Sequence, residues 1–240
     1  MINVKILYED KNIIVCVKPA GMPSQGERSS SMDLVSWLKN YLSKQQGNAR
    51  NGVPYVSVVH RLDRPVGGIM VYAKTKKAAE VLSQQFANHQ TEKKYLTVLT
   101  GSVLNPEGML EHMLLKDGKT NMSSVVESGG KLAKLDYKVL EVKDERSLVL
   151  VTLHTGRHHQ IRVQMSHTGA GIYGDMKYNR EGTLKWQEKH GMRGRSSELC
   201  LFSCELAFEH PETKKRMHFK VLPGSGSMTI DEWESLSYYE

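Results

Sequence analysis

The chain has 240 residues, a length that predicts one large domain or two small ones. Its 33 lysines and arginines exceed its 26 aspartates and glutamates, and the net charge of +7 indicates an anionic partner. No apolar run reaches the roughly 18 residues of a membrane span, so we expect no membrane contact. The N-terminus lacks a signal-peptide pattern, and three cysteines are too few for a disulfide framework, so we expect a cytoplasmic protein.

The first hundred residues predict strands and helices in alternation. Short apolar or β-rich runs between turn residues predict strands at residues 13–17, 55–62, 69–73 and 94–100. Residues 32–42 have the apolar spacing of a helix. A second helix follows Thr75, which has the side chain of an N-cap residue, and continues to Phe86.

The second half of the chain is richer in predicted strands. Extended segments are expected within residues 105–130 and at 132–142, 147–154, 199–209 and 217–221, the last two forming a hairpin. Residues 157–165 fit either a strand or the start of a helix, and residues 179–197 are expected to be a long basic loop. Strands that follow one another directly predict an α+β fold with a largely antiparallel sheet.

Two motifs carry candidate chemistry. Asp63 stands at a turn between Arg61 and Arg64, which favour its ionised form, although an aspartate there is most often only a turn former. Arg162 lies between apolar residues, and a buried arginine needs a carboxylate because an unpaired buried charge is costly. We therefore expect Arg162 to pair with Asp63.

Other kinds of site have weaker support. His154, His158 and His159 lie beside arginines, and Cys200 and Cys204 have no second pair, so no metal site is expected. The sequence contains neither a phosphate-binding loop nor a Rossmann glycine motif, which argues against a nucleotide cofactor.

Five blocks in order resemble the RluA-type family of RNA pseudouridine synthases, and the resemblance extends from about residue 5 to residue 222. The blocks are Val17–Met22, His60–Asp63 with the following Gly67–Lys74, Lys93–Leu96, Thr155–Arg162, and Gly174-Asp175 with Lys177-Tyr178. A single block of four residues is a weak signal, whereas five blocks in the family order are specific.

The resemblance implies a fold, a set of catalytic residues and the absence of a cofactor. The fold is a mixed, mainly antiparallel sheet in two subdomains with a central cleft, and neither metal nor organic cofactor is used. Asp63 matches the catalytic aspartate, Tyr95 the tyrosine that stacks on the uracil, and Arg162 the basic partner of the aspartate. Arg61 matches the arginine that takes the place of the flipped base.

The resemblance also implies an RNA partner and a domain organisation. Residues 1–222 are expected to form the catalytic domain without an N-terminal S4 domain, and residues 223–240, with four acids and no lysine or arginine, an acidic tail. We expect a monomer that binds rRNA or tRNA. The expected RNA contacts are Lys18, Arg61, Arg64, Arg157, His159, Arg180, Lys185, Arg193 and Arg195.

The sequence leaves the mechanism and two other functions open. Asp63 could attack C1′ of the ribose or remove the C2′ proton. The main alternative is an RNA-binding or RNA-folding protein that kept the fold without catalysis. A glycosidase would need a second carboxylate opposite Asp63, where the sequence supplies arginines.

Overall fold

The structure is a computed structural model in which the chain forms two compact units. It describes residues 4–26, 32–45, 52–101, 105–194, 197–224, 228 and 230–238. The first unit comprises residues 1–92 and 205–221, and the second comprises residues 93–204 and 222–240. The chain therefore leaves the first unit after Glu92 and returns to it at Glu205.

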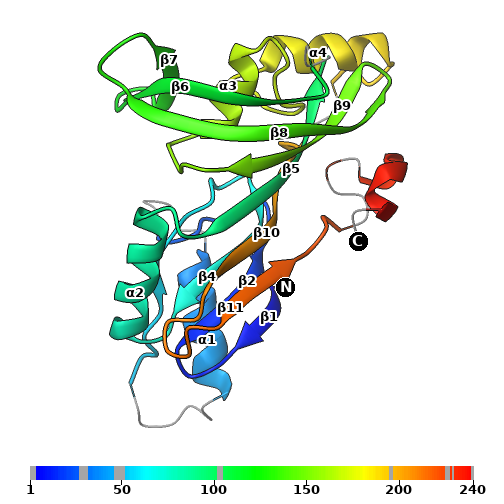
Figure 1. Ribbon diagram of the computed structural model, residues 1–240. Coiled ribbons are helices and arrows are strands. Elements are labelled where there is room, and N and C mark those ends of the chain that lie inside the picture. Colours follow the sequence, from blue (N-terminus) through cyan, green and yellow to red (C-terminus); the bar gives the residue numbers. More distant parts are fainter. Residues whose placement is uncertain are drawn as a thin grey trace. The chain divides into compact units, whose positions relative to one another are not determined.

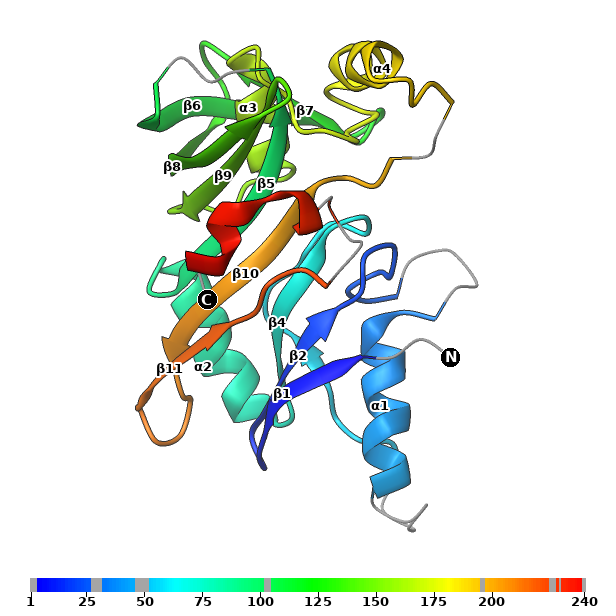
Figure 2. The ribbon, with the colours of Figure 1, turned by 90° about the vertical axis from the view of Figure 1, so that its right-hand side faces the viewer.

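The first unit contains a sheet in the order β1-β2-β4-β10 (Figure 2), with β3 on β4 and β11 on β10. The pairs β1–β2, β2–β4, β3–β4 and β10–β11 are antiparallel. The register of β2 and β4 places Val15 opposite Val71 and Lys18 opposite Gly68. The strands are β1 (Lys5–Glu9), β2 (Ile13–Lys18), β3 (Ser57–Val58), β4 (Gly67–Ala73), β10 (Leu201–Glu209) and β11 (Arg216–Lys220). The first residues of β10, Leu201 to Cys204, belong to the second unit.

Two helices, α1 (Leu34–Gln45) and α2 (Lys76–Ala87), belong to the first unit. The Thr75 hydroxyl accepts the Ala78 N–H at 3.1 Å, which confirms the predicted N-cap. Alternate side chains of β2 and β4 pack with one face of α2 because strand residues alternate between faces. The resulting core contains Ile13, Val15, Ile69, Val71, Ala73, Ala78, Leu82, Leu206 and Phe208.

The second unit contains an antiparallel sheet in the order β5-β9-β8-β6-β7, together with helices α3 and α4 (Figure 1). Its strands are β5 (Glu92–Thr100), β6 (Glu107–Asp117), β7 (Met122–Val126), β8 (Lys131–Lys143) and β9 (Arg146–Leu153). A small core joins Leu114, Ala133 and Val163, so α3 (Gln160–His167) packs on the β6–β8 part of this sheet.

The structure corrects some expectations and settles another. Residues 179–197 were expected to be a loop, but Arg180–Lys189 forms α4, because Thr183, Trp186 and Gln187 recur at helical spacing and are buried. Residues 157–165, for which both a strand and a helix were open, contribute to α3. Within residues 55–62 only Ser57–Val58 is a strand, and β1 was not foreseen.

The acidic C-terminal segment packs within the second unit. Two short 3₁₀ helices, Ile230–Glu232 and Glu234–Tyr238, place the Trp233 indole against the buried guanidinium of Arg146, 5.6 Å from the ring centroid. Arg146 also forms an ion pair with Glu232 and lies 4.0 Å from the centroid of Trp186. The negative charge of the segment is thus used in part to neutralise a buried arginine.

Candidate active site

Asp63 lies in a tight turn directly before β4. The Val66 N–H donates to the Asp63 carbonyl at 3.0 Å, which closes a four-residue turn over Asp63–Val66. Lys18, at the end of β2, is completely buried and donates through Nζ to the carbonyls of Pro19 (3.0 Å), Met22 (2.7 Å) and Arg64 (3.1 Å). The Lys18 ammonium group therefore links the Asp63 turn to the turn after β2 by hydrogen bonds.

Two further side chains fix the segment that leads into Asp63. The Ser24 hydroxyl donates to the Leu62 carbonyl at 2.8 Å and accepts the Leu62 N–H at 3.2 Å. His60 Nε2 accepts the Val71 N–H at 3.1 Å, and its ring stacks on Phe86 at 4.3 Å. Because these contacts hold the backbone on both sides, the direction of the half-buried Asp63 side chain is restricted.

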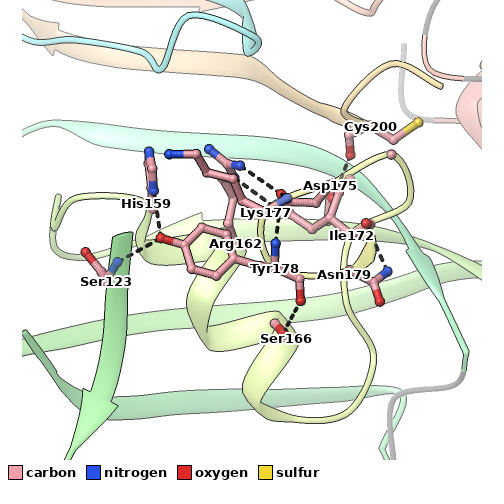
Figure 3. A network of polar contacts seen from close by, with 12 residues as sticks. Ser123, His159, Arg162, Ser166, Ile172, Asp175, Lys177, Tyr178, Asn179 and Cys200 are labelled. Carbon is pink, nitrogen blue, oxygen red and sulfur yellow. Dashed lines mark hydrogen bonds and ion pairs between the residues drawn. The ribbon is translucent and has the colours of Figure 1, made fainter. Parts of the chain in front are cut away.

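Arg162 projects from α3 and is 5% exposed. Asp175 binds it through two parallel hydrogen bonds, from Nε to Oδ2 at 2.7 Å and from Nη2 to Oδ1 at 2.8 Å (Figure 3). Asp175 Oδ1 also accepts the N–H groups of Lys177 (3.0 Å) and Tyr178 (3.2 Å). This bidentate pair fixes the plane of the guanidinium, and it supplies the carboxylate partner that a buried arginine requires.

Tyr178 supports the same guanidinium from a second direction. The Arg162 guanidinium carbon lies 5.1 Å from the Tyr178 ring centroid, a distance typical of a cation–π contact. The Tyr178 hydroxyl accepts the Ser123 N–H from β7 at 2.8 Å and lies 2.8 Å from His159 Nδ1 (Figure 3). The arginine is thereby connected to the β6–β7 hairpin.

Tyr95 lies in β5, opposite Val151 of β9, and is 7% exposed. Its neighbour Lys93 is also buried, and burial lowers the pKa of its ammonium group below the usual range. The block Lys93–Leu96 lies within β5, which confirms the strand predicted at residues 94–100.

The three predicted catalytic residues are divided between the units. Asp63 belongs to the first unit, whereas Tyr95 and Arg162 belong to the second. The pairing of Asp63 with Arg162 stays a prediction. The structure adds Asp175 and Tyr178 to the site, and the family block Gly174-Asp175 with Lys177-Tyr178 was the sequence signal that contained both.

The predicted RNA-contacting residues have different environments. Lys18 needs correction, because its fully buried ammonium binds three carbonyls and is unsuited to contact a phosphate. Arg61 and Arg64 are exposed, and Arg64 Nε donates to the Gly21 carbonyl at 3.0 Å. Arg157 donates to the Leu132 carbonyl at 2.8 Å, and His159 contacts Tyr178 as described above.

The basic residues of α4 and its continuation are largely occupied by acidic neighbours. Lys185 lies 2.6 Å from Glu181, and Arg193 lies 3.4 Å from Glu188. Arg180 is exposed at the start of the helix, and Arg195 lies outside the described residues. Because acidic neighbours compensate part of this positive charge, residues 180–195 are expected to attract a polyanion less strongly than their lysines and arginines alone suggest.

Neither a cluster of metal ligands nor a membrane-spanning helix occurs in the described part of the chain. Among these residues there is no group of three or more histidine, cysteine or acidic side chains that could hold a metal ion. Within the same ranges no helix has the length and apolar character needed to cross a bilayer.

Solved structures show which fold this is. The human RNA pseudouridylate synthase domain containing 4 superposes with a TM-score of 0.74 at 23% identity, covering 92% of this chain and 89% of that one. The human RNA pseudouridylate synthase domain containing 1 gives 0.72 at 22% identity, covering 92% and 84%. The mixed, mainly antiparallel α+β fold is therefore the pseudouridylate synthase fold, as predicted.

Sequence relatives then establish the family. The family described as RNA pseudouridylate synthase matches residues 12–167. The dual-specificity RNA pseudouridine synthase RluA of Yersinia pestis is 33% identical over 90% of this chain and 97% of its own length. An uncharacterized RNA pseudouridine synthase of Bacillus subtilis is 32% identical over 91% of this chain and 69% of its own length. The chain belongs to the RNA pseudouridine synthase family, in its RluA-type branch, and is an isomerase.

Proposed function

We propose that Asp63 is the catalytic aspartate with which this chain converts uridine in RNA to pseudouridine. The observation that carries the proposal is the turn itself, since Lys18, Ser24 and the hydrogen bond from the Val66 N–H to the Asp63 carbonyl fix the residues around Asp63. Catalytic groups need such fixed surroundings because small displacements from the reacting atoms are costly in rate. Asp63 also lies within the segment that matches the family.

The reaction needs a carboxylate beside the ribose and a cation that keeps it charged and directed. We assign the second role to Arg162. Asp175 holds Nε and one Nη2 hydrogen of this guanidinium, and the planar, five-donor group of an arginine is suited to orienting a carboxylate. Because Asp175 compensates part of its charge, we expect Arg162 to act mainly by orienting Asp63.

Tyr95 is proposed as the platform on which the uracil ring stacks. An enzyme that acts on a base within RNA must take the base out of its stack, and an aromatic ring recovers part of that cost. The paired strand β5 holds Tyr95 at a fixed position, which suits such a platform. Arg61, which is exposed, is proposed to fill the space that the base leaves.

The proposed substrate is rRNA or tRNA in the cytoplasm, acted on by a monomer. Relatives are named as enzymes of the ribosomal large subunit or as dual-specificity enzymes, which supports this range of substrates. We propose that residues 1–222 carry the catalysis.

The direct test is tritium release from RNA labelled at C5 of uridine, prepared from cells that lack the gene. Wild-type protein is expected to release tritium, and Asp63→Asn to reduce the rate by at least about a thousandfold, because the amide can neither attack nor accept a proton. Asp144→Asn is a matched control in an exposed turn, where a residue at φ 49° tolerates asparagine.

Three results bear on the assignment. Release that persists in Asp63→Asn would remove Asp63 from the catalytic role. Loss of release in Asp144→Asn would show that the assay reports folding and not chemistry. RNA binding by the wild type without release from any cellular RNA would support the non-catalytic alternative.

A further inference from the structure

Two groups of cations in the second unit have different surroundings. On α4 and its continuation, Lys185, Lys189 and Arg193 have acidic partners. A second group surrounds the β6–β7 hairpin and has no acidic partner among the residues that the structure describes; it consists of Lys116, Lys119, Lys131, Arg157 and Lys177. We call this second group the hairpin patch.

The strand register places two of these lysines on the same face of the hairpin. Directly opposed residues of an antiparallel pair point to the same side of the sheet. Lys116 is opposite Ser123, whose hydroxyl lies 2.9 Å from His158 Nδ1, and Lys131 is opposite Leu114, which packs with Val163 of α3. Lys116 and Lys131 therefore extend along the edge of the face that α3 covers.

Hydrogen bonds bring two more members of the hairpin patch to the same edge. Lys177 Nζ donates to the Asn121 carbonyl in the hairpin turn at 3.2 Å, and Arg157 Nε donates to the Leu132 carbonyl at 2.8 Å. Lys119 lies in the turn itself. Lys177 also stands between Asp175 and Tyr178 in the chain, so the hairpin patch adjoins the residues that hold Arg162 (Figure 3).

The one acidic residue in the hairpin turn is already engaged. Asp117 accepts the Thr120 hydroxyl and the Lys119 N–H, each at 2.8 Å, and these hydrogen bonds hold the pKa of its carboxyl below the usual value. The Asp117 carboxylate accepts these two hydrogen bonds within the turn, and neither comes from a charged group. The positive charge of the surrounding lysines is therefore not compensated by Asp117 and can attract an anionic ligand.

We propose that the hairpin patch binds phosphate groups of the RNA next to the nucleotide that reacts. Exposed lysines without acidic partners suit such contacts, because they release the counterions of the RNA and position it without reading its sequence. The main RNA contact of this unit is thereby placed on the β6–β7 hairpin and not on α4. This inference rests on the proposed function, since it takes RNA as the substrate.

The test compares two triple variants with equal loss of charge. Lys116→Gln, Lys119→Gln and Lys131→Gln are combined in the hairpin variant, whereas the α4 variant combines Lys185→Gln, Lys189→Gln and Arg193→Gln. Affinity for a fluorescein-labelled, unmodified tRNA transcript is measured between 50 and 300 mM KCl. All six side chains are exposed, and the thermal unfolding midpoint of each variant checks that it is folded.

The hairpin variant is expected to bind about tenfold to a hundredfold more weakly at 0.1 M salt, and its slope of log affinity against log salt should fall by about 2, since each lost phosphate contact removes about 0.7. The α4 variant is expected to change the slope by less than about 1. In the tritium-release assay the hairpin variant should raise KM and leave kcat within about twofold.

Four outcomes separate this inference from the proposed function. An unchanged slope in the hairpin variant, with wild-type pseudouridine formation intact, would overturn the hairpin patch and leave the function standing. An equal loss in the α4 variant would also overturn it. A reduced slope without any pseudouridine formation by the wild type would support the surface and reject the function. Loss of binding to a poly-glutamate peptide with unchanged RNA affinity would assign the surface to an acidic protein partner instead.

Discussion

At the scale of single residues, buried cations organise both parts of the proposed site. Lys18 fastens the turn of Asp63 by binding three backbone carbonyls, whereas Arg162 is held by a carboxylate and an aromatic ring. In each case a charge is kept away from water and compensated by directed hydrogen bonds, which is the condition under which a buried charge is tolerated. We therefore expect Lys18 and Arg162 to act as positioning residues, whereas the proposed chemistry belongs to Asp63.

We expect Lys18→Met to lower the free energy of unfolding by about 2–4 kcal/mol. Methionine fills the space of the stem but leaves the carbonyls of Pro19, Met22 and Arg64 without their common donor, and unsatisfied buried acceptors are costly. Urea denaturation measures the effect. Lys77→Met, on an exposed face of α2, is the control and should change stability by less than about 0.5 kcal/mol. Equal stability of the two variants would contradict the role given to Lys18.

At the scale of elements, the segment between α3 and α4 carries much of the second half of the site. Asp175 and Tyr178 lie in this segment, and Gly174, directly before Asp175, has φ +81°, a conformation that glycine adopts without strain. A Cβ atom at Gly174 would overlap the backbone carbonyl of Glu198. The Gly174 N–H also donates to the Thr183 hydroxyl of α4 at 3.1 Å, so this glycine joins the segment to the helix.

Gly174→Ala is expected to destabilise the protein by about 2–5 kcal/mol, because positive φ and a clash with backbone act together. The thermal unfolding midpoint is the measurement. Gly118→Ala serves as the matched control, since a Cβ at that position meets no atom within 4 Å and its φ is not in the left-handed range. A midpoint for Gly174→Ala within one degree of that control would show that the segment can shift at little cost.

At the scale of the whole molecule, the chain passes three times between its two units, after Glu92, after Cys204 and after Val221. Residues 205–221 return to the first unit, and residues 222–240 belong again to the second. The last segment buries Ile230, Trp233 and Leu236 and covers Arg146. The acidic C-terminal segment is therefore part of the folded second unit, because its apolar side chains are buried there.

Removal of the Trp233 side chain should therefore weaken the second unit. We expect Trp233→Ala to cost about 2–4 kcal/mol in the free energy of unfolding, because a buried indole is lost and Arg146 loses one of its aromatic contacts. Chemical denaturation followed by circular dichroism tests this, with Leu184→Ala, an exposed residue of α4, as control. If both variants unfold at the same denaturant concentration, the C-terminal segment contributes nothing to stability.

The sequence by itself determined the features that depend on neighbouring residues. Local residue preferences predicted the turn at Asp63, the Thr75 cap and the β10–β11 hairpin. The order of short motifs along the chain indicated the family. The α+β fold was predictable for the same reason, because directly successive strands favour antiparallel pairing.

Only the tertiary structure decided which polar groups meet. Asp175 is 13 residues from Arg162, and Ser123 is 55 residues from Tyr178, so no local pattern indicated either contact. Lys18 and Lys116 are both lysines in the sequence, yet one is buried under three carbonyls and the other is exposed on a hairpin. Local sequence fixes which charges a chain carries, whereas packing determines which of them are neutralised and which face a ligand.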